Sequence, residues 1–154
     1  MSADVQPLRT QLQEFERRLR LRVAAWQAAE EDKGMAWAGA LARTPELFDL
    51  ALRLALEDAV PRDERERLLA ALLYVAAPVD LLPEKVLGAE GYRDDLLVLA
   101  LALARVGAKV SADLVAARWT GEGEPREVIG EIISRGEEIA GPTLWRRIMD
   151  WIDR

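Results

Sequence analysis

The sequence predicts an all-α protein, a compact helical bundle of about six or seven helices around a central apolar helical hairpin. Apolar residues recur at spacings of three and four along nearly the whole chain. No segment alternates apolar and polar residues in the manner of a half-buried strand, and no hairpin turn pair is present. Two strongly apolar segments flank a short loop between Leu72 and Leu99, which predicts that they pack together as the hairpin.

Length and composition favour an ordinary globular protein. The chain has 154 residues, 51% of them apolar and 31% charged, enough to bury a core without disulfides or metals. We expect residues 1–120 to form a helical bundle that contains the hairpin at about 67–101. The sequence TGEGEP at 120–125 is typical of a linker. Beyond it, residues 125–154 are expected to form a helical pair packed on the bundle or on a partner.

The first expected helix runs from about residue 7 to residue 31 and carries one apolar seam. Its members are Leu8, Leu12, Phe15, Leu19, Val23 and Trp26. Two interpretations stay open: a long helix packed on the rest of the domain, or a coiled-coil or dimer arm. The basic run of Arg17, Arg18, Arg20 and Arg22 suits a solvated face or an anionic partner.

The next segments each carry a helix boundary signal. A short segment covers 35–42, and a helix over 44–57 begins at Thr44 and Pro45, with the Thr44 hydroxyl as its expected N-cap. The helix that follows Pro61 is apolar almost all round from Leu68, which is typical of a buried helix, and Pro78 ends it.

Three further helices are expected after the hairpin loop. The first starts with Asp94 as N-cap and runs to about Trp119, with a bend near Gly107. The second covers 126–140 and ends at Gly141 and Pro142. The third covers 143–152.

Several classes of function are excluded or disfavoured by composition. The chain has neither cysteine nor histidine, so thiolate nucleophiles, histidine-dependent triads and cysteine zinc sites are impossible. A net charge of −6 disfavours nucleic acid as a partner. The amino terminus lacks a signal-peptide core, and the longest uncharged apolar run, 68–79, is too short to span a membrane. We expect a soluble, cytoplasmic protein.

The loop between the apolar helices is acidic, and two interpretations of it stay open. In one, the carboxylates fix a turn and stabilise the start of the next helix. In the other, four of them converge on magnesium, manganese or calcium, since only oxygen ligands are available. These four candidate ligands are Asp80, Glu84, Asp94 and Asp95. No spacing matches a known calcium loop.

The same region resembles a family. The segment from Arg67 to Leu101 contains LLYVAAPVDLLPE, with Tyr74, Pro78, Asp80, Pro83 and Glu84, followed by GYRDDL, with Gly91, Tyr92, Asp94 and Asp95. In order and spacing it resembles the YkvA-like family, a small bacterial domain of unknown function. The resemblance implies a helical hairpin core and no established activity. Some relatives are membrane-associated, which keeps a membrane surface open as a partner.

Three functions therefore compete. The leading expectation is a non-catalytic protein-interaction or scaffold module without a cofactor, which binds a protein partner or forms a homo-oligomer. Its candidate contact residues are Leu12, Leu19, Trp26, Trp145 and Trp151. The second is peripheral membrane association through Trp145 and Trp151 beside Arg146 and Arg147. The third is a divalent-metal-dependent enzyme that uses Asp80, Asp94 and Asp95. No small-molecule substrate is indicated.

Overall fold

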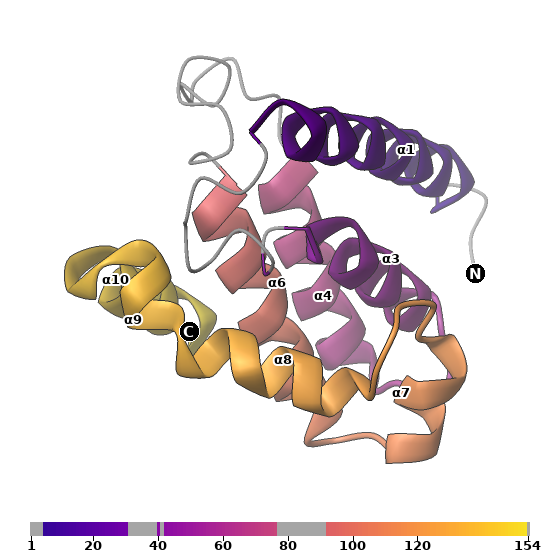
Figure 1. Cartoon of the computed structure of the whole chain (residues 1–154). Helices are drawn as coiled ribbons and strands as arrows, with labels where there is room; N and C mark the ends of the chain where they lie inside the picture. Colours follow the sequence, from indigo (N-terminus) through magenta and orange to yellow (C-terminus); the bar gives the residue numbers. More distant parts are fainter. Residues whose placement is uncertain (1–4, 31–39, 41, 77–91, 154) are drawn as a thin grey trace.

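The computed structural model describes residues 5–30, 40, 42–76 and 92–153, and this part of the chain contains helices and connecting turns without strands. The predicted all-α fold is confirmed. Figure 1 shows the helices, whose bounds are α1 (Val5–Glu30), α3 (Thr44–Ala55), α4 (Arg62–Ala76), α6 (Tyr92–Gly107), α7 (Ala112–Arg118), α8 (Pro125–Ser134), α9 (Gly136–Ala140) and α10 (Pro142–Asp153).

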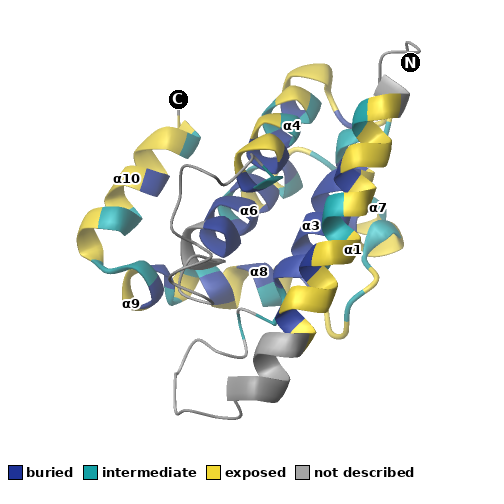
Figure 2. Cartoon of the chain, turned by 90° about the horizontal axis from the view of Figure 1, so that it is seen from above, coloured by how far each residue is buried: buried dark blue, intermediate teal, exposed yellow. Residues whose placement is uncertain are grey.

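Helices α3, α4 and α6 form the centre of the bundle and pack on one another. Helix α1 lies across α3 and α4 on one side, and α8 runs along α6 on the other (Figure 1). Helices α9 and α10 lie at one edge against α6, and α7 lies beside α3 at the opposite edge. Burial follows this arrangement, because the outer side of α1 is exposed while the facing sides of α3, α4 and α6 are buried (Figure 2).

The hairpin of α4 and α6 supplies much of the core. From Leu96 to Ala100, five consecutive residues of α6 are buried, as expected for a helix enclosed on all sides. Helix α4 differs from the sequence expectation. It buries Leu68 and Leu72, but Leu73 and Tyr74 are 44% and 39% exposed. Helix α4 is therefore buried on the face that carries Leu68 and Leu72, and it is partly exposed where Leu73 and Tyr74 lie.

Several helix boundaries depart from the expected ones. Helix α3 begins at Thr44 itself, so Arg43 occupies the N-cap position and makes no side-chain cap. The helix expected to run to Trp119 is two helices, and α7 starts anew because the Ser111 hydroxyl accepts a hydrogen bond from the Leu114 amide at 3.1 Å. The helix expected over 126–140 is also divided, into α8 and α9, at Arg135. These divisions give more helices than expected.

The linker after α7 is held against α3. The Thr120 hydroxyl donates to Asp49 Oδ2 at 3.1 Å, and Arg43 donates to the Glu122 carbonyl at 3.0 Å. Within the linker, the Trp119 indole donates to the Gly123 carbonyl at 3.0 Å. Beyond it, the C-terminal helices contribute Ile129, Ile132, Ile139 and Ile148 to the same core cluster as α3, α4 and α6.

Candidate functional site

The acidic residues proposed as metal ligands lie mostly outside the described part of the chain. Asp80 and Glu84 fall in 77–91, and only the backbone of Asp94 is described. Asp95 is 2% exposed, and because α6 begins at Tyr92, both aspartates lie in its first turn rather than at its N-cap. A carboxylate there is favoured by the helix dipole. The residues that the structure describes contain no group of three potential ligands, so the metal site stays a prediction.

The apolar seam of α1 faces the core. Leu12 and Leu19, proposed as contact residues, are 3% and 2% exposed, and Phe15 packs on Phe48 of α3 with ring centroids 5.2 Å apart. The side chain of Trp26 lies outside the described residues. Within one chain, this seam is used to attach α1 to α3 and α4. Association of two chains through it would require α1 to detach.

Trp145 also packs within the chain. Its indole ring lies so close to Gly136 that a β-carbon at position 136 would come within 2.5 Å of two ring carbons. Trp145 is half-buried and belongs to the group of side chains packed against the core. This contact joins α10 to α9.

The two helices α4 and α10 bring together a pair of exposed aromatic side chains. Tyr74 and Trp151, called the aromatic pair below, have ring centroids 5.4 Å apart at an interplanar angle of 39°. They remain 39% and 38% exposed, respectively. Trp151 was a predicted contact residue, whereas Tyr74 was not recognised because α4 was expected to be buried all round. The sequence does contain a signal for this difference. Leu72 and Tyr74 are two positions apart, and residues at this spacing lie on nearly opposite faces of an α-helix.

Helix α10 is attached to the bundle at two points. Ile148 is buried in the core. At the end of the helix, the Arg105 guanidinium of α6 donates to the Ile152 carbonyl and lies 3.8 Å from the Asp153 carboxylate. Trp151 of the aromatic pair therefore lies on a helix that is attached to the core, and its ring is in contact with that of Tyr74.

The fold and this surface define a small all-helical protein built on an apolar hairpin. Residues 67–101, which include most of α4 and the first part of α6, match the model of a family described as a protein of unknown function (DUF1232). The match confirms the recognised hairpin and covers less than a quarter of the chain. No curated protein matches, and no solved structure matches. Among the described helices, none is long and apolar enough to cross a membrane.

Proposed function

We propose that this protein is a non-catalytic helical interaction module that binds a protein partner through the aromatic pair. The observation that carries the proposal is the contact between Tyr74 and Trp151, two exposed rings supplied by different helices. Exposed tyrosine and tryptophan are enriched at protein interfaces, because each ring buries a large apolar area at low entropic cost. The expected cytoplasmic location is part of the same proposal.

The surroundings of the aromatic pair support a protein as the occupant. On α10, Arg146, Arg147 and Asp150 are exposed, so the helix presents charges of both signs beside Trp151. A polar rim of mixed charge around an aromatic centre is the usual composition of an interface between proteins. A second copy of this chain is the first partner to test, because self-association can be measured with the purified protein alone.

The test compares Trp151→Ser with Leu21→Ser. Leu21 is 61% exposed on α1 and lies on another helix, so it is a matched control for the loss of one exposed apolar side chain. We expect sedimentation velocity over a wide concentration range to show self-association of the wild type. Trp151→Ser should weaken it about thirtyfold, corresponding to ~2 kcal/mol for a central interface residue, and Leu21→Ser should leave it unchanged.

If the wild type is monomeric, a cross-linking residue at position 147, which is exposed one turn before Trp151 on α10 and leaves the aromatic pair intact, identifies a partner in cells of the source organism. The proposal holds when one protein is captured by the wild type and by Leu21→Ser but lost with Tyr74→Ser. A monomeric protein whose captured proteins are the same for all three forms refutes it.

Peripheral membrane binding is the second candidate, and the exposure of Trp151 and Met149 beside two arginines favours it. We expect Trp145 to contribute less to membrane binding than the sequence indicated, because its ring packs on Gly136. The test is co-sedimentation with anionic liposomes at low salt. Binding that is lost with Trp151→Ser supports this candidate, and failure of the wild type to co-sediment removes it.

A further inference from the structure

A groove of about 530 Å³ lies between α1 and α3, with a contribution from α7. Arginines dominate its charged lining: Arg9, Arg17, Arg20, Arg53 and Arg118. Its lining carboxylates are Glu16 and Asp49, so the charged side chains carry a formal excess of three positive charges. The whole chain carries a net charge of −6. Glu14 and Glu57, which pair with Arg17 and Arg118 from outside the lining, reduce this excess to one. The groove thus stays positive on a chain that is acidic overall.

Helix α1 positions its arginines through its buried seam. Arg9, Gln13, Glu16, Arg17 and Arg20 follow one another at helical spacings and line the groove. The adjacent face of the same helix carries the seam, whose buried leucines attach α1 to the core. The groove therefore has a rigid wall, although it is built from long side chains.

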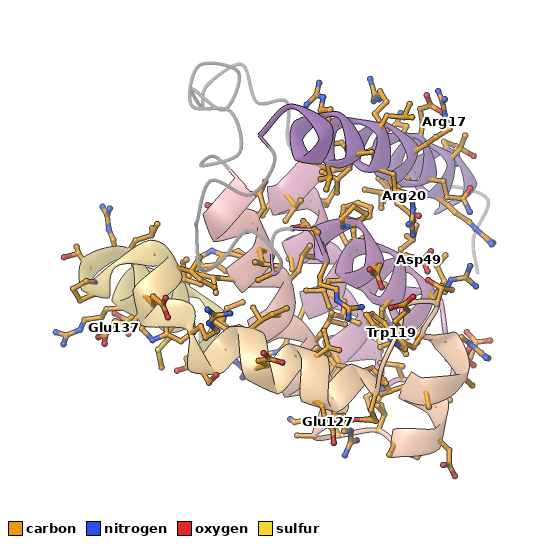
Figure 3. The ribbon with its side chains drawn as sticks, viewed as in Figure 1. Arg17, Arg20, Asp49, Trp119, Glu127 and Glu137 are labelled. Atoms are coloured by element: carbon orange, nitrogen blue, oxygen red, sulfur yellow. The ribbon has the colours of Figure 1, made fainter. Side chains whose placement is uncertain are left out.

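Two buried carboxylates orient two of the arginines. The Arg20 Nε donates to Glu16 Oε2 at 3.1 Å, and the Arg53 Nε donates to Asp49 Oδ2 at 2.9 Å. The carboxylate side chains are only 15% and 11% exposed, whereas the two arginine side chains are 46% and 51% exposed. Figure 3 shows Arg20 and Asp49 in the space between α1 and α3.

These pairs leave the outer ends of both guanidinium groups available. Each carboxylate engages Nε, and the Nη groups of Arg20 and Arg53 have no hydrogen-bond partner among the described residues. A guanidinium held at Nε presents its terminal N–H groups in a fixed fork, which matches the oxygens of a phosphate. Arg9, which also lines the groove, forms neither an ion pair nor a side-chain hydrogen bond with the residues that the structure describes.

The remaining arginines are more strongly engaged. Arg17 binds Glu14 through Nε at 3.2 Å and Nη2 at 2.5 Å, and Arg118 binds Glu57 through Nε at 3.0 Å and Nη2 at 2.7 Å. Their charges are balanced by these carboxylates, and they have fewer free donors. The direct contacts to a ligand are therefore assigned to Arg9, Arg20 and Arg53.

We propose that this groove binds a small anion with two or more phosphate groups. Three guanidinium groups with free donors, contributed by α1 and α3, exceed what one phosphate needs and suit neighbouring phosphates. The volume is within the range of small-molecule sites. An extended nucleic acid is disfavoured, because the positive charge is confined to one groove of an acidic protein. This inference is independent of the aromatic pair.

The experiment is isothermal titration calorimetry with inorganic tripolyphosphate on the full chain. Arg9→Gln is the first variant, because it removes a guanidinium that stabilises no described carboxylate. The matched pair of double variants is Arg9→Gln/Arg17→Gln and Arg146→Gln/Arg147→Gln. Each removes two exposed positive charges, the first from the groove and the second from α10.

We expect saturable binding by the wild type at one site. Arg9→Gln should weaken it about tenfold, corresponding to the loss of one charge-assisted hydrogen bond of ~1.5 kcal/mol. The groove double variant should bind more weakly still, and Arg146→Gln/Arg147→Gln should bind nearly as the wild type does. Trp151→Ser should bind as tightly as the wild type, which separates this site from the proposed interface.

Two outcomes overturn the proposal. One is the absence of binding by folded wild-type protein at low salt. The other is an equal loss of affinity in the two double variants, which indicates long-range attraction without a site. Vesicles that contain cardiolipin, whose headgroup carries two phosphates, distinguish the source of the phosphate and are tested with Trp151→Ser, which lacks the exposed tryptophan of α10. Vesicle binding by this variant that tripolyphosphate displaces supports a lipid headgroup as one source of the ligand, and binding that it cannot displace contradicts a lipid headgroup as the ligand of this groove.

Discussion

The indole ring of Trp145 occupies the space where a side chain at Gly136 would stand. A β-carbon at position 136 would lie 2.5 Å from Cη2 and Cζ3 of that ring, which is closer than real contacts allow. Because the ring is also packed against the core, it has little freedom to move aside. Gly136 is therefore required for the close approach of α9 and α10.

This relationship predicts that Gly136→Ala destabilises the protein by about 1–3 kcal/mol through overpacking. The matched control is Gly130→Ala in α8, where a β-carbon would meet nothing within 4 Å. That substitution should stabilise the helix by ~0.5–1 kcal/mol, the usual preference for alanine over glycine. Urea denaturation of both variants checks the signs. If Gly136→Ala is as stable as Gly130→Ala, Trp145 does not pack as described.

The family segment offers a second matched pair, at Leu72 and Leu73 of α4. Leu72 is fully buried and Leu73 is 44% exposed. Leu72→Ala should lower the free energy of unfolding by about 2–5 kcal/mol, because it leaves a cavity between the central helices. Leu73→Ala should change it by less than ~0.5 kcal/mol. Similar losses for both variants would mean that α4 is buried on all sides, as its composition first indicated.

A third pair tests whether the seam of α1 packs within one chain. Leu19 is 2% exposed and Leu21 is 61% exposed. Leu19→Ala should lower the free energy of unfolding by about 2–5 kcal/mol at any protein concentration, and Leu21→Ala should be nearly neutral. Thermal unfolding at several protein concentrations is the measurement. A loss of stability that disappears on dilution would instead indicate that Leu19 lies in an interface between chains.

The fourth prediction concerns pH. Burial, and then the negative charge of Asp49, raise the pKa of Glu16 above its ordinary value of 4.5. The carboxyl group of Glu16 therefore binds its proton more tightly in the folded chain than in the unfolded chain. This tighter binding of the proton adds to the free energy of unfolding. The contribution is fully present below pH 4.5 and is lost as the pH rises through the raised pKa of Glu16. Glu16→Gln should therefore gain stability relative to the wild type as the pH rises through that window.

Glu14→Gln is the control, because the hydrogen bond from Arg17 lowers the pKa of Glu14, which is exposed on the same helix. Its pH dependence has the opposite sign: relative to the wild type, Glu14→Gln should lose stability as the pH rises. Urea denaturation at a series of pH values measures both differences. Parallel curves for Glu16→Gln and the wild type would show that folding does not raise the pKa of Glu16.

Local signals predicted the elements well where one residue type controls the boundary. Pro45 stands near the start of α3, Pro125 begins α8, and Gly141, with a φ of 84°, separates α9 from α10. The hairpin was predictable because two apolar segments of that length must bury themselves against each other. Helix α6 ends at Gly107, where a bend was expected. The new start of α7 after Ser111 and the division at Arg135 were not predicted, because helical spacing continues on both sides of each division.

The candidate sites were less predictable, because they combine residues from distant segments. Helical spacing placed Trp151 on α10 but could not place Tyr74 beside it. The basic run on α1 was visible in the sequence, whereas its meeting with Arg53 of α3 and Arg118 of α7 depends on how three helices pack.

By itself, the sequence determined the helical class, the hairpin with its resemblance to a family, and the absence of histidine and cysteine chemistry, since these depend on residue type and local spacing. Only the tertiary structure decided which apolar residues remain exposed and which arginines share a groove. Exposure and charge clustering depend on which helices cover one another, and helical periodicity is the same whether a face meets the core, a partner or water. For this reason Leu12 and Leu19 belong to the core, and Trp151 with Tyr74 lies at the surface.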